Sequence, residues 1–597
     1  MLKRARLRLV AAVVGGGLLL LAGWLAWQGW QVQRDLADAA DRAAAIQRLV
    51  AAHDDSGSDG DARLDTRLDD ELDGLRAASA AAAERTSGPA WRLLTHLPVV
   101  GDDAAGVATT SRVLDELSRD GVAPLVHAAG RFDRLVPRDG VLDLAVARDL
   151  VEPVARADRA FDRARRRLAA VDDRGFAGPL ARRFTSFEDQ VDRAARALGP
   201  ARVATEVLPA MLGGDGPRRY LLVFQNNAEV RSTGGLPGAA SYVEARDGRL
   251  TMRAHVTGAS FGEAPAPVLP LSAAERALYG DVLGTYFVDA TMTPDVPRAA
   301  DLLRARWQQR YPDRPVDGVV LVDAVAIGYL LDATGPVRVG GVRLSGDNVV
   351  DELLHRAYLR LPEPRRQDAF FARVAAATLD RLTAGSGDPR ALLAALRRAA
   401  DERRVFVHSF VAADRAALAG TAVAGELDVP GPGSGRPRVD VTLDDTTGAK
   451  MSYYLRYDVD VTATSCVAGV QKYAAKARLR STAPPDAASL PAYVTGGGRY
   501  GVPAGSQLVT LRIFAPAGGE LGALTWNGEP LELERVEHDG RPVGMTYVQL
   551  DPGQVADLAW TMRSGPRQVG TTALAVTPTI ERKDGAETLA SACSPGR

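Results

Sequence analysis

The sequence predicts a multidomain protein with an N-terminal transmembrane helix, an all-helical region, an α/β core domain and a C-terminal antiparallel β-sandwich. Three observations carry this prediction. An apolar run of membrane-spanning length lies near the N-terminus, the hydrophobic period is helical as far as residue 212, and strand-like patterns begin at residue 219. A chain of 597 residues is also longer than a single hydrophobic core usually supports.

Residues 9–30 are predicted to anchor the chain in a membrane. Leu9–Trp27 carries no charged residue and is long enough to cross the hydrocarbon core of a bilayer. The basic residues of the tail over residues 1–8 place that tail in the cytoplasm and the bulk of the chain outside it. The apolar run is longer than that of a cleaved signal peptide. We therefore expect a single-pass protein of the cell membrane whose anchor is not cleaved.

Residues 31–212 form the predicted all-helical, membrane-proximal region. Trp24, Trp27 and Trp30 precede it at helical spacing, as in an aromatic belt at the outer membrane interface. An apolar heptad then predicts packing along a partner helix. Its residues are Val32, Leu36, Ala39, Ala43, Ile46 and Val50. A homo-oligomer formed through this region is one expected use of that seam.

Residues 215–425 are predicted to form the α/β core domain. Tyr220–Phe224 is a continuous apolar run of the length of a buried strand, and Arg246-Asp-Gly-Arg249 carries the Asp-Gly signal of a hairpin turn. Strand patterns then alternate with helical ones. A partner among nucleic acids is not expected, because the net charge of the whole chain is only -1.

Residues 437–597 follow a Gly- and Pro-rich linker and are predicted to form the β-sandwich. Asn527-Gly528 and Asp539-Gly540 mark hairpin turns between alternating apolar patterns. The chain has only two cysteines, Cys466 and Cys593, and both lie in this part. In an oxidising exterior a lone pair of cysteines predicts a disulfide that stabilises the fold.

The densest polar cluster directly follows the first predicted strand, in the segment Gln225–Gly235. Its candidate ligand-binding residues are Asn226, Asn227, Glu229, Arg231, Gly234 and Gly235. Arg231 has the paired donors that bind a phosphate or carboxylate, and the two glycines permit close approach of a ligand to the backbone. The alternative is structural: Glu229 pairs with Arg231, and the two asparagines cap the turn.

A second cluster lies between two amphipathic helical patterns and contains Arg365, Arg366 and Gln367. Its arginines either converge on an anion or belong to a solvated turn between helices. Known catalytic motifs assign no reaction. A Gly-x-Ser-x-Gly match at Gly258–Gly262 is followed by Pro265, Pro267 and Pro270, which prevent the helix that this motif needs.

The segment Tyr220–Gly235 closely resembles the hallmark of the domain-of-unknown-function 4012 family of bacterial membrane proteins. Three further stretches are similar to that family: Pro294–Pro297 with Trp307, Asp317–Asp323, and Asp332–Val337. The resemblance extends over roughly residues 90 to 470. It implies a membrane protein of bacteria but names no activity.

The stretch from Asp317 through Gly335-Pro-Val337 to Arg366-Gln367 is similar to the later half of LytR-CpsA-Psr proteins. That resemblance implies an α-β-α layered core and an anchored enzyme that transfers polyprenyl-phosphate-linked glycopolymers to the cell wall. Arg366 and Gln367 would contact phosphate. Mg²⁺ is the implied cofactor, with Asp295, Asp317 or Asp323 as its ligands. One departure is that His255-Val-Thr-Gly258 stands where those proteins have Arg-Asp.

These observations lead to two expectations for function. The first is an extracytoplasmic cell-envelope protein that binds or transfers a polyprenyl-phosphate-linked glycopolymer. The second is a non-catalytic scaffold of the cell envelope whose β-sandwich binds another envelope protein or a glycan. Geometry separates them, because Arg231 and Arg366 should face one apolar-walled cavity if they bind a shared ligand.

Overall fold

The computed structural model describes residue 24 and residues 27–50, 58–98, 100–132, 135, 137, 139–385, 387–427, 435–583 and 585–593. They form two compact units. The helical unit comprises Met1–Leu135 and Asp143–Leu208, and the sheet unit comprises Val136–Leu142 and Pro209–Arg597. The predicted transmembrane run Leu9–Trp27 lies outside the described residues, apart from Trp24 and Trp27. Among the helices that are described, none combines the length and the apolar character needed to cross a membrane.

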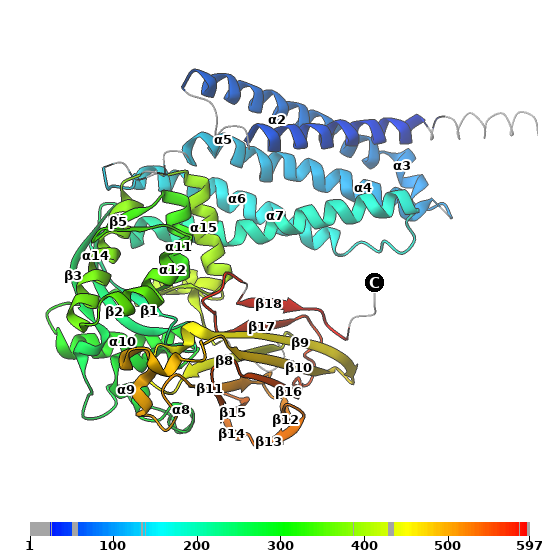
Figure 1. Ribbon diagram of the computed structural model, residues 1–597. Coiled ribbons are helices and arrows are strands. Elements are labelled where there is room, and N and C mark those ends of the chain that lie inside the picture. Colours follow the sequence, from blue (N-terminus) through cyan, green and yellow to red (C-terminus); the bar gives the residue numbers. More distant parts are fainter. Residues whose placement is uncertain are drawn as a thin grey trace, which may run out of the picture. The chain divides into compact units, whose positions relative to one another are not determined.

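The helical unit confirms that the N-terminal part of the chain is helical (Figure 1). A helix over residues 27–50 is followed by α2 (Ser58–Ser87), α3 (Pro89–Leu94), α4 (Gly101–Glu116), the π-helical turn η2 (Leu117–Val122), α5 (Ala123–Phe132), α6 (Leu144–Leu168) and α7 (Gly178–Met211). Local sequence sets these boundaries. Asp143, for example, caps α6 by accepting a hydrogen bond from the backbone N–H of Ala145 at 2.9 Å.

The apolar heptad of the first helix is buried within this same chain. Ala39 and Ile46 share one core with leucines of α2, namely Leu68, Leu72 and Leu75. Two ion pairs flank that core. The guanidinium group of Arg85 lies 2.8 Å from the carboxylate of Asp35, and that of Arg42 lies 3.4 Å from the carboxylate of Glu71. The helix over residues 27–50 and α2 therefore run antiparallel, and α2 is the partner helix that the heptad predicted.

The sheet unit begins with a five-stranded mixed sheet of order β3-β2-β1-β4-β7. The strands are β1 (Arg218–Asn226), β2 (Leu236–Arg246), β3 (Arg249–Thr257), β4 (Gly318–Asp323) and β7 (Val405–Ser409). Only β1 and β4 pair in parallel. The predicted Asp-Gly hairpin joins β2 to β3, with positive φ at Asp247 and Gly248.

Helices pack on both faces of this sheet (Figure 1). Leu221 and Val223 of β1 face a core that includes Leu303 of α10 (Val296–Arg310), whereas Leu222 and Phe224 face a core with Ile327 of α11 (Ala324–Thr334). Alternation along the strand produces these two faces. The first face also carries α8 (Ala273–Tyr279), α9 (Val282–Thr285) and η5 (Phe287–Met292), and the second carries α14 (Pro364–Thr383) and α15 (Pro389–Asp401).

Short elements complete this α/β part. They are η4 (Gly258–Phe261), β5 (Val337–Val339), β6 (Val342–Leu344), α12 (Val349–Asp351), η6 (Glu352–Arg356), α13 (Ala357–Arg360), α16 (Ala412–Leu418) and η7 (Ala422–Ala424). The segment before α6 also belongs to the sheet unit, because Val141 forms a β-bridge with Arg249 of β3. The predicted helical region of residues 31–212 is therefore interrupted by a segment that pairs with the α/β sheet.

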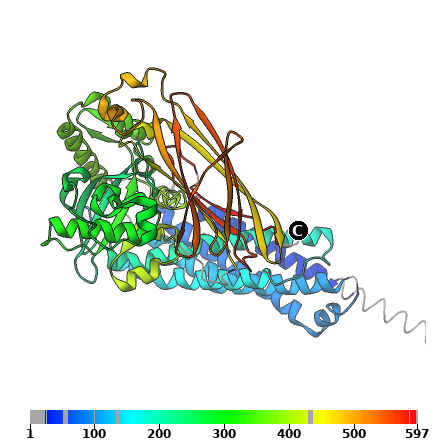
Figure 2. The same ribbon diagram turned by 90° about the horizontal axis from the view of Figure 1, so that it is seen from below.

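The C-terminal part, which we call the two-sheet domain, contains a six-stranded sheet of order β14-β15-β11-β8-β17-β18 and a five-stranded sheet of order β13-β12-β16-β10-β9. Figure 2 shows their strands, coloured yellow to red, side by side. The strands are β8 (Arg438–Asp445), β9 (Leu455–Val467), β10 (Val470–Ser481), β11 (Gln507–Phe514), β12 (Glu520–Trp526), β13 (Glu529–Leu531), β14 (Glu534–His538), β15 (Arg541–Leu550), β16 (Val555–Arg563), β17 (Thr572–Val576) and β18 (Ala586–Leu589).

One apolar core is shared by both sheets and includes Leu511 of β11 and Trp560 of β16. The predicted disulfide is confirmed: Cys466 at the end of β9 is bonded to Cys593, with their Cα atoms 4.9 Å apart. The prediction of a purely antiparallel arrangement is wrong at one place, since β17 runs parallel to β8. β17 is not joined to β8 by a hairpin, so no tight turn forces the two to be antiparallel.

Candidate functional site

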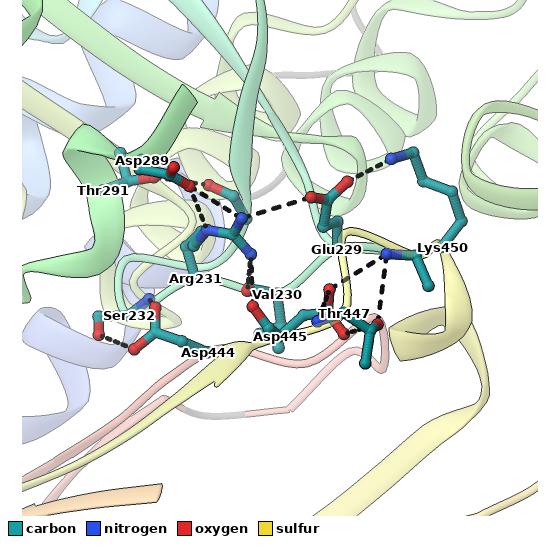
Figure 3. Close-up of polar contacts among 12 residues, drawn as sticks. Glu229, Val230, Arg231, Ser232, Asp289, Thr291, Asp444, Asp445, Thr447 and Lys450 are labelled. Carbon is teal, nitrogen blue, oxygen red and sulfur yellow. Dashed lines mark hydrogen bonds and ion pairs between the residues drawn. The ribbon is translucent and has the colours of Figure 1, made fainter. Parts of the chain in front are cut away.

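The loop between β1 and β2 is buried against the segment that follows β8 in the two-sheet domain (Figure 3). It holds most of the predicted ligand-binding residues. We call this contact region the joint. Its charged and polar members are Glu229, Arg231 and Ser232 from the loop, Asp289 from η5, and Asp444, Asp445, Thr447 and Lys450 from the two-sheet domain.

Local sequence fixes the shape of the β1–β2 loop. The side-chain oxygen of Asn226 accepts a hydrogen bond from the backbone N–H of Ala228 at 3.1 Å, as in an Asx turn. A Cβ atom at Gly235 would lie 2.5 Å from the carbonyl carbon of Asn226, so the backbone leaves no room for a side chain there. At Gly234, φ is +129°. These two glycines therefore allow the loop to fold back onto its own backbone.

Arg231 is enclosed by acceptors of the protein, and only 5% of the residue is exposed. Its guanidinium group donates hydrogen bonds to Asp289 at 3.0 Å and Glu229 at 3.3 Å. It also donates to the backbone carbonyls of Val230 at 3.0 Å and Asp445 at 3.1 Å. Burial alone would lower the pKa of Arg231, but the carboxylates of Asp289 and Glu229 outweigh it and raise that pKa. The guanidinium is thus permanently charged and internally paired.

Glu229 links the loop to the two-sheet domain through a second buried ion pair, with the ammonium group of Lys450. Burial would raise the pKa of Glu229, but Lys450 and Arg231 together hold it below its usual value. Burial would likewise lower the pKa of Lys450, and Glu229 reverses that effect. Lys450 also lies over the ring of Tyr493, 5.0 Å from its centroid. Both members of the pair therefore stay charged in the folded protein.

Two adjacent aspartates at the end of β8 complete the joint. Asp444 accepts hydrogen bonds from the backbone N–H of Ser232 at 2.9 Å and from its hydroxyl at 3.0 Å, and it pairs with Arg512. The backbone N–H of Asp445 donates to the carbonyl of Val230 at 2.9 Å. Burial, followed by repulsion from Glu229, raises the pKa of the Asp445 carboxyl to about 6. Backbone and side-chain bonds therefore join the two domains at the same place.

The two asparagines of the loop hold it to the α/β part. Asn226 donates to the hydroxyl of Tyr358 at 2.7 Å, and Asn227 donates to the carboxylate of Asp323 at 3.0 Å. Asp323 also pairs with Arg404 at 3.0 Å, and Arg404 donates to the carbonyl of Thr579 at 2.7 Å. A second tie between the α/β part and the C-terminal segment therefore adjoins the joint.

Sequence reasoning missed Arg404, Lys450 and Asp444 as members of this network. One signal was available for Asp444, because Asp444-Asp445 closes a strand of otherwise alternating apolar residues. Nothing comparable marks Lys450 or Arg404, whose partners are up to 221 residues away.

Comparison with protein families supports the resemblance predicted from the loop and its neighbours. Residues 215–358 match the model of a family described as "Protein of unknown function (DUF4012)". We call residues 215–358, which are similar to this family, the DUF4012 region. The match is shorter than the expected span of roughly residues 90 to 470, and it includes β1 to β4 with the joint residues Glu229, Arg231 and Asp289.

No curated protein matches the chain, and no solved structure matches it either. The similarity to LytR-CpsA-Psr proteins therefore remains a prediction.

The second predicted cluster lies just beyond the DUF4012 region, on the first turn of α14. Arg365 and Arg366 are exposed, and Arg366 pairs with Glu363 at 3.1 Å. Gln367 is buried and donates to the carbonyl of Leu361 at 2.7 Å. Arg231 is enclosed by the joint while Arg366 points to solvent, so the two arginines do not face one enclosed cavity.

The three predicted metal ligands have structural partners instead. Asp317 accepts a hydrogen bond from the backbone N–H of Arg219 at 2.8 Å, and Asp295 accepts one from that of Leu427 at 2.9 Å. Asp317 precedes β4 and Asp323 ends it, so they are about 20 Å apart at roughly 3.3 Å per residue and cannot bind the same ion. In the part of the chain that the structure describes, no group of three or more His, Cys, Asp or Glu side chains is placed to hold a metal ion.

Proposed function

We propose that the protein is a membrane-anchored scaffold of the cell envelope, with residues 9–30 as its anchor and its bulk outside the cytoplasm. In this proposal the DUF4012 region and the two-sheet domain, acting as a β-sandwich, form one rigid block. One observation carries it: the charged loop suited to a ligand is instead paired with the two-sheet domain through Arg231, Glu229 and Lys450.

The energetics of the joint support rigidity. Interfaces between domains of one chain usually permit relative motion unless they are large and hydrophobic. Val230 of the loop belongs to the apolar core of the two-sheet domain. Here the charges are out of water, and removing one partner of a buried pair typically costs about 3–5 kcal/mol because the other is left unpaired. Three backbone groups of the loop, those of Ala228, Val230 and Ser232, are also bonded to the two-sheet domain. A rigid block of this kind suits a protein that holds envelope components at a fixed spacing.

The joint can be tested by a double-mutant cycle on the full-length chain in detergent. Glu229→Gln and Lys450→Met should each destabilise the sheet unit strongly, and the double variant should lose less than the sum of the two. The difference from additivity should be about 1–3 kcal/mol, measured by urea unfolding. Lys472→Met is the matched control, because Lys472 is an exposed lysine of β10. Additive losses would contradict the proposed joint.

A second candidate function is binding or transfer of a polyprenyl-phosphate-linked glycopolymer. The observation that favours it is the exposure of Arg365 and Arg366 at the start of the 20-residue helix α14. The N-terminus of a helix attracts anions through its unpaired N–H groups and its dipole. A bound Mg²⁺ would help to neutralise the phosphate groups of such a ligand. Among the described residues, no cluster of three or more His, Cys, Asp or Glu side chains is arranged to hold the ion.

Lipid-phosphate binding separates the two candidates. Undecaprenyl phosphate is titrated into the full-length protein in detergent. Three proteins are compared: the wild type, the double variant Arg365→Ala/Arg366→Ala, and the variant Arg231→Met. The scaffold proposal expects no saturable binding. Binding that is lost in the double variant with unchanged stability would favour the second candidate, and Arg231→Met is expected to affect stability rather than binding.

A homo-oligomer through the helical unit is a further proposal. Because the heptad of the helix over residues 27–50 is covered by α2, such a contact would use another face of the unit. Light scattering of the purified full-length chain would measure its mass.

A further inference from the structure

One end of the helical unit exposes large apolar side chains. Leu93, Leu97 and Val100 are 53%, 41% and 43% exposed and lie within eight residues of each other. The side chains of Trp27 and Trp30, at the start of the first helix, are also exposed. Figure 1 shows α3 beside that start. Apolar residues gathered in this way on a surface usually mark a contact with another apolar phase.

A cavity of about 470 Å³ places α3 next to Trp24 and to Gln28 of the first helix. Its apolar lining comes from Trp24, from Ala81 of α2, and from Pro89, Ala90, Trp91 and Leu94 of α3. The pair between Arg85 and Asp35 fixes the antiparallel register of α2 beside the first helix. At 1.5 Å per residue this register returns the end of α2, and hence α3, to the level of Trp24–Trp30.

The exposed side chains are held outward by the local fold. The indole N–H of Trp91 donates to the carbonyl of Ala104 at 2.8 Å, which fixes α3 against α4. Gly101 allows the turn into α4, because a Cβ atom there would lie 2.8 Å from the carbonyl oxygen of Thr95. With both ends of the segment fixed, Leu93, Leu97 and Val100 remain on the surface.

We propose that Leu93, Leu97 and Val100 insert into the outer interface of the bilayer that residues 9–30 span. This inference rests on the anchor in the proposed function. Tryptophans at the outer end of a membrane-spanning helix lie at the level of the lipid headgroups, and the segment after α3 is at the level of Trp24 to Trp30. The helical unit then has two attachments to the membrane, and two attachments fix its orientation where one helix would leave it free to turn.

The contact is apolar rather than electrostatic. Arg92 and His96 are the basic residues of the segment, while Asp102 and Asp103 follow on the first turn of α4. This mixture has no positive excess that would attract anionic lipids. The insertion should therefore persist at high salt, which screens interactions between exposed charges.

The test uses the full-length chain in nanodiscs of phosphatidylcholine and phosphatidylglycerol, with and without brominated acyl chains. Leu93→Cys and Leu97→Cys are labelled with an environment-sensitive dye without reductant, so that the bond between Cys466 and Cys593 stays intact. Leu393→Cys is the matched control, because Leu393 in α15 is a leucine of similar exposure, 60%. We expect blue-shifted emission and at least twofold quenching by brominated lipid at positions 93 and 97, none at 393, and no change in 0.5 M salt.

Alkaline carbonate extraction separates the possible failures. A chain that stays in the bilayer but shows no quenching at position 93 would overturn the inference and leave the anchor standing. Release of the chain by carbonate would contradict the proposed transmembrane anchor, and the inference that rests on it would fail as well. As a second variant, Leu93→Ser/Leu97→Ser should abolish the quenching of a probe at Val100→Cys without releasing the chain.

Discussion

The helical unit and the sheet unit both pair arginine with acidic residues, but they do so in different surroundings. In the helical unit, Arg159 and Glu152 of α6 pair at 2.9 Å with both side chains largely in water. In the sheet unit, Arg404 and Asp323 pair at 3.0 Å with neither side chain exposed. The pair of Arg541 with Asp440, at 2.7 Å, is buried in the same way.

The difference between the two units lies in solvation. An exposed ion pair replaces hydration that each charge would have anyway, so it contributes at most about 1 kcal/mol. A buried pair cannot be hydrated when one partner is lost, and breaking it therefore costs several times more. Ion pairs of arginine with acidic residues such as Arg159–Glu152 therefore add little to the stability of the helical unit, whereas in the sheet unit buried pairs join segments that are distant in the chain.

The largest effect is expected at Arg404. Arg404→Met leaves Asp323 buried without its guanidinium partner and removes one of the two guanidinium partners of Glu402. The free energy of unfolding of the sheet unit should therefore fall by about 3–5 kcal/mol. Urea unfolding of the full-length chain in detergent, followed by tryptophan fluorescence, would measure it. A loss below 1 kcal/mol would mean that burial does not separate the two classes of ion pair in this protein.

A smaller but substantial effect is expected from the covalent link of the sheet unit. The bond between Cys466 and Cys593 closes a loop with a sequence separation of 127 residues. The variant Cys466→Ala/Cys593→Ala should therefore unfold more easily by about 2–5 kcal/mol. The helical unit contains no cysteine, so its own thermal transition in calorimetry should not move. A shift in that transition would show that the two units unfold together.

The stability of the joint is expected to depend on pH through the buried carboxyl of Asp445. The folded pKa of Asp445 is raised to about 6 by burial, so the folded state holds a proton that the unfolded state releases near pH 4. The stability that this proton supplies is complete below pH 4 and is lost as the pH rises through 6. Asp445→Asn keeps the group neutral and should remove this loss, with a gain of about 1–3 kcal/mol at pH 7 relative to wild type.

Urea midpoints of wild type and Asp445→Asn at pH 5 and pH 7.5 would measure that gain. The difference between the two proteins isolates Asp445 from Asp444 and Asp289, whose pKa values burial also raises. Equal pH dependence in both proteins would contradict the assignment.

The smallest effect is expected in the helical unit. Arg159→Met makes the same chemical change as Arg404→Met, but the ion pair that it breaks is exposed, so water can hydrate the carboxylate of Glu152 that is left behind. Its cost should be within about 0.5 kcal/mol, measured as the shift of the helical unit's transition in calorimetry. A larger loss would show that α6 depends on its surface charges more than their exposure implies.

Much of the local structure followed from the sequence. The heptad through Ala39 and Ile46 has the period of a helix, and the Asp247-Gly248 turn accepts the positive φ of a tight hairpin, so both were predictable from neighbours a few residues away. The disulfide followed from counting, since Cys466 and Cys593 are the only cysteines. The apolar run Tyr220–Phe224 likewise identified the central strand β1.

Only the tertiary structure decided what the loop after β1 does. The sequence left two interpretations of Arg231 open, ligand binding and internal pairing, because both use the same donors. Its partners are Asp289 and Asp445, which lie 58 and 214 residues further along the chain. Residue type fixes which bonds a side chain can form, but burial by a distant segment determines which of them it does form, and that burial arises only when the two-sheet domain packs on the loop.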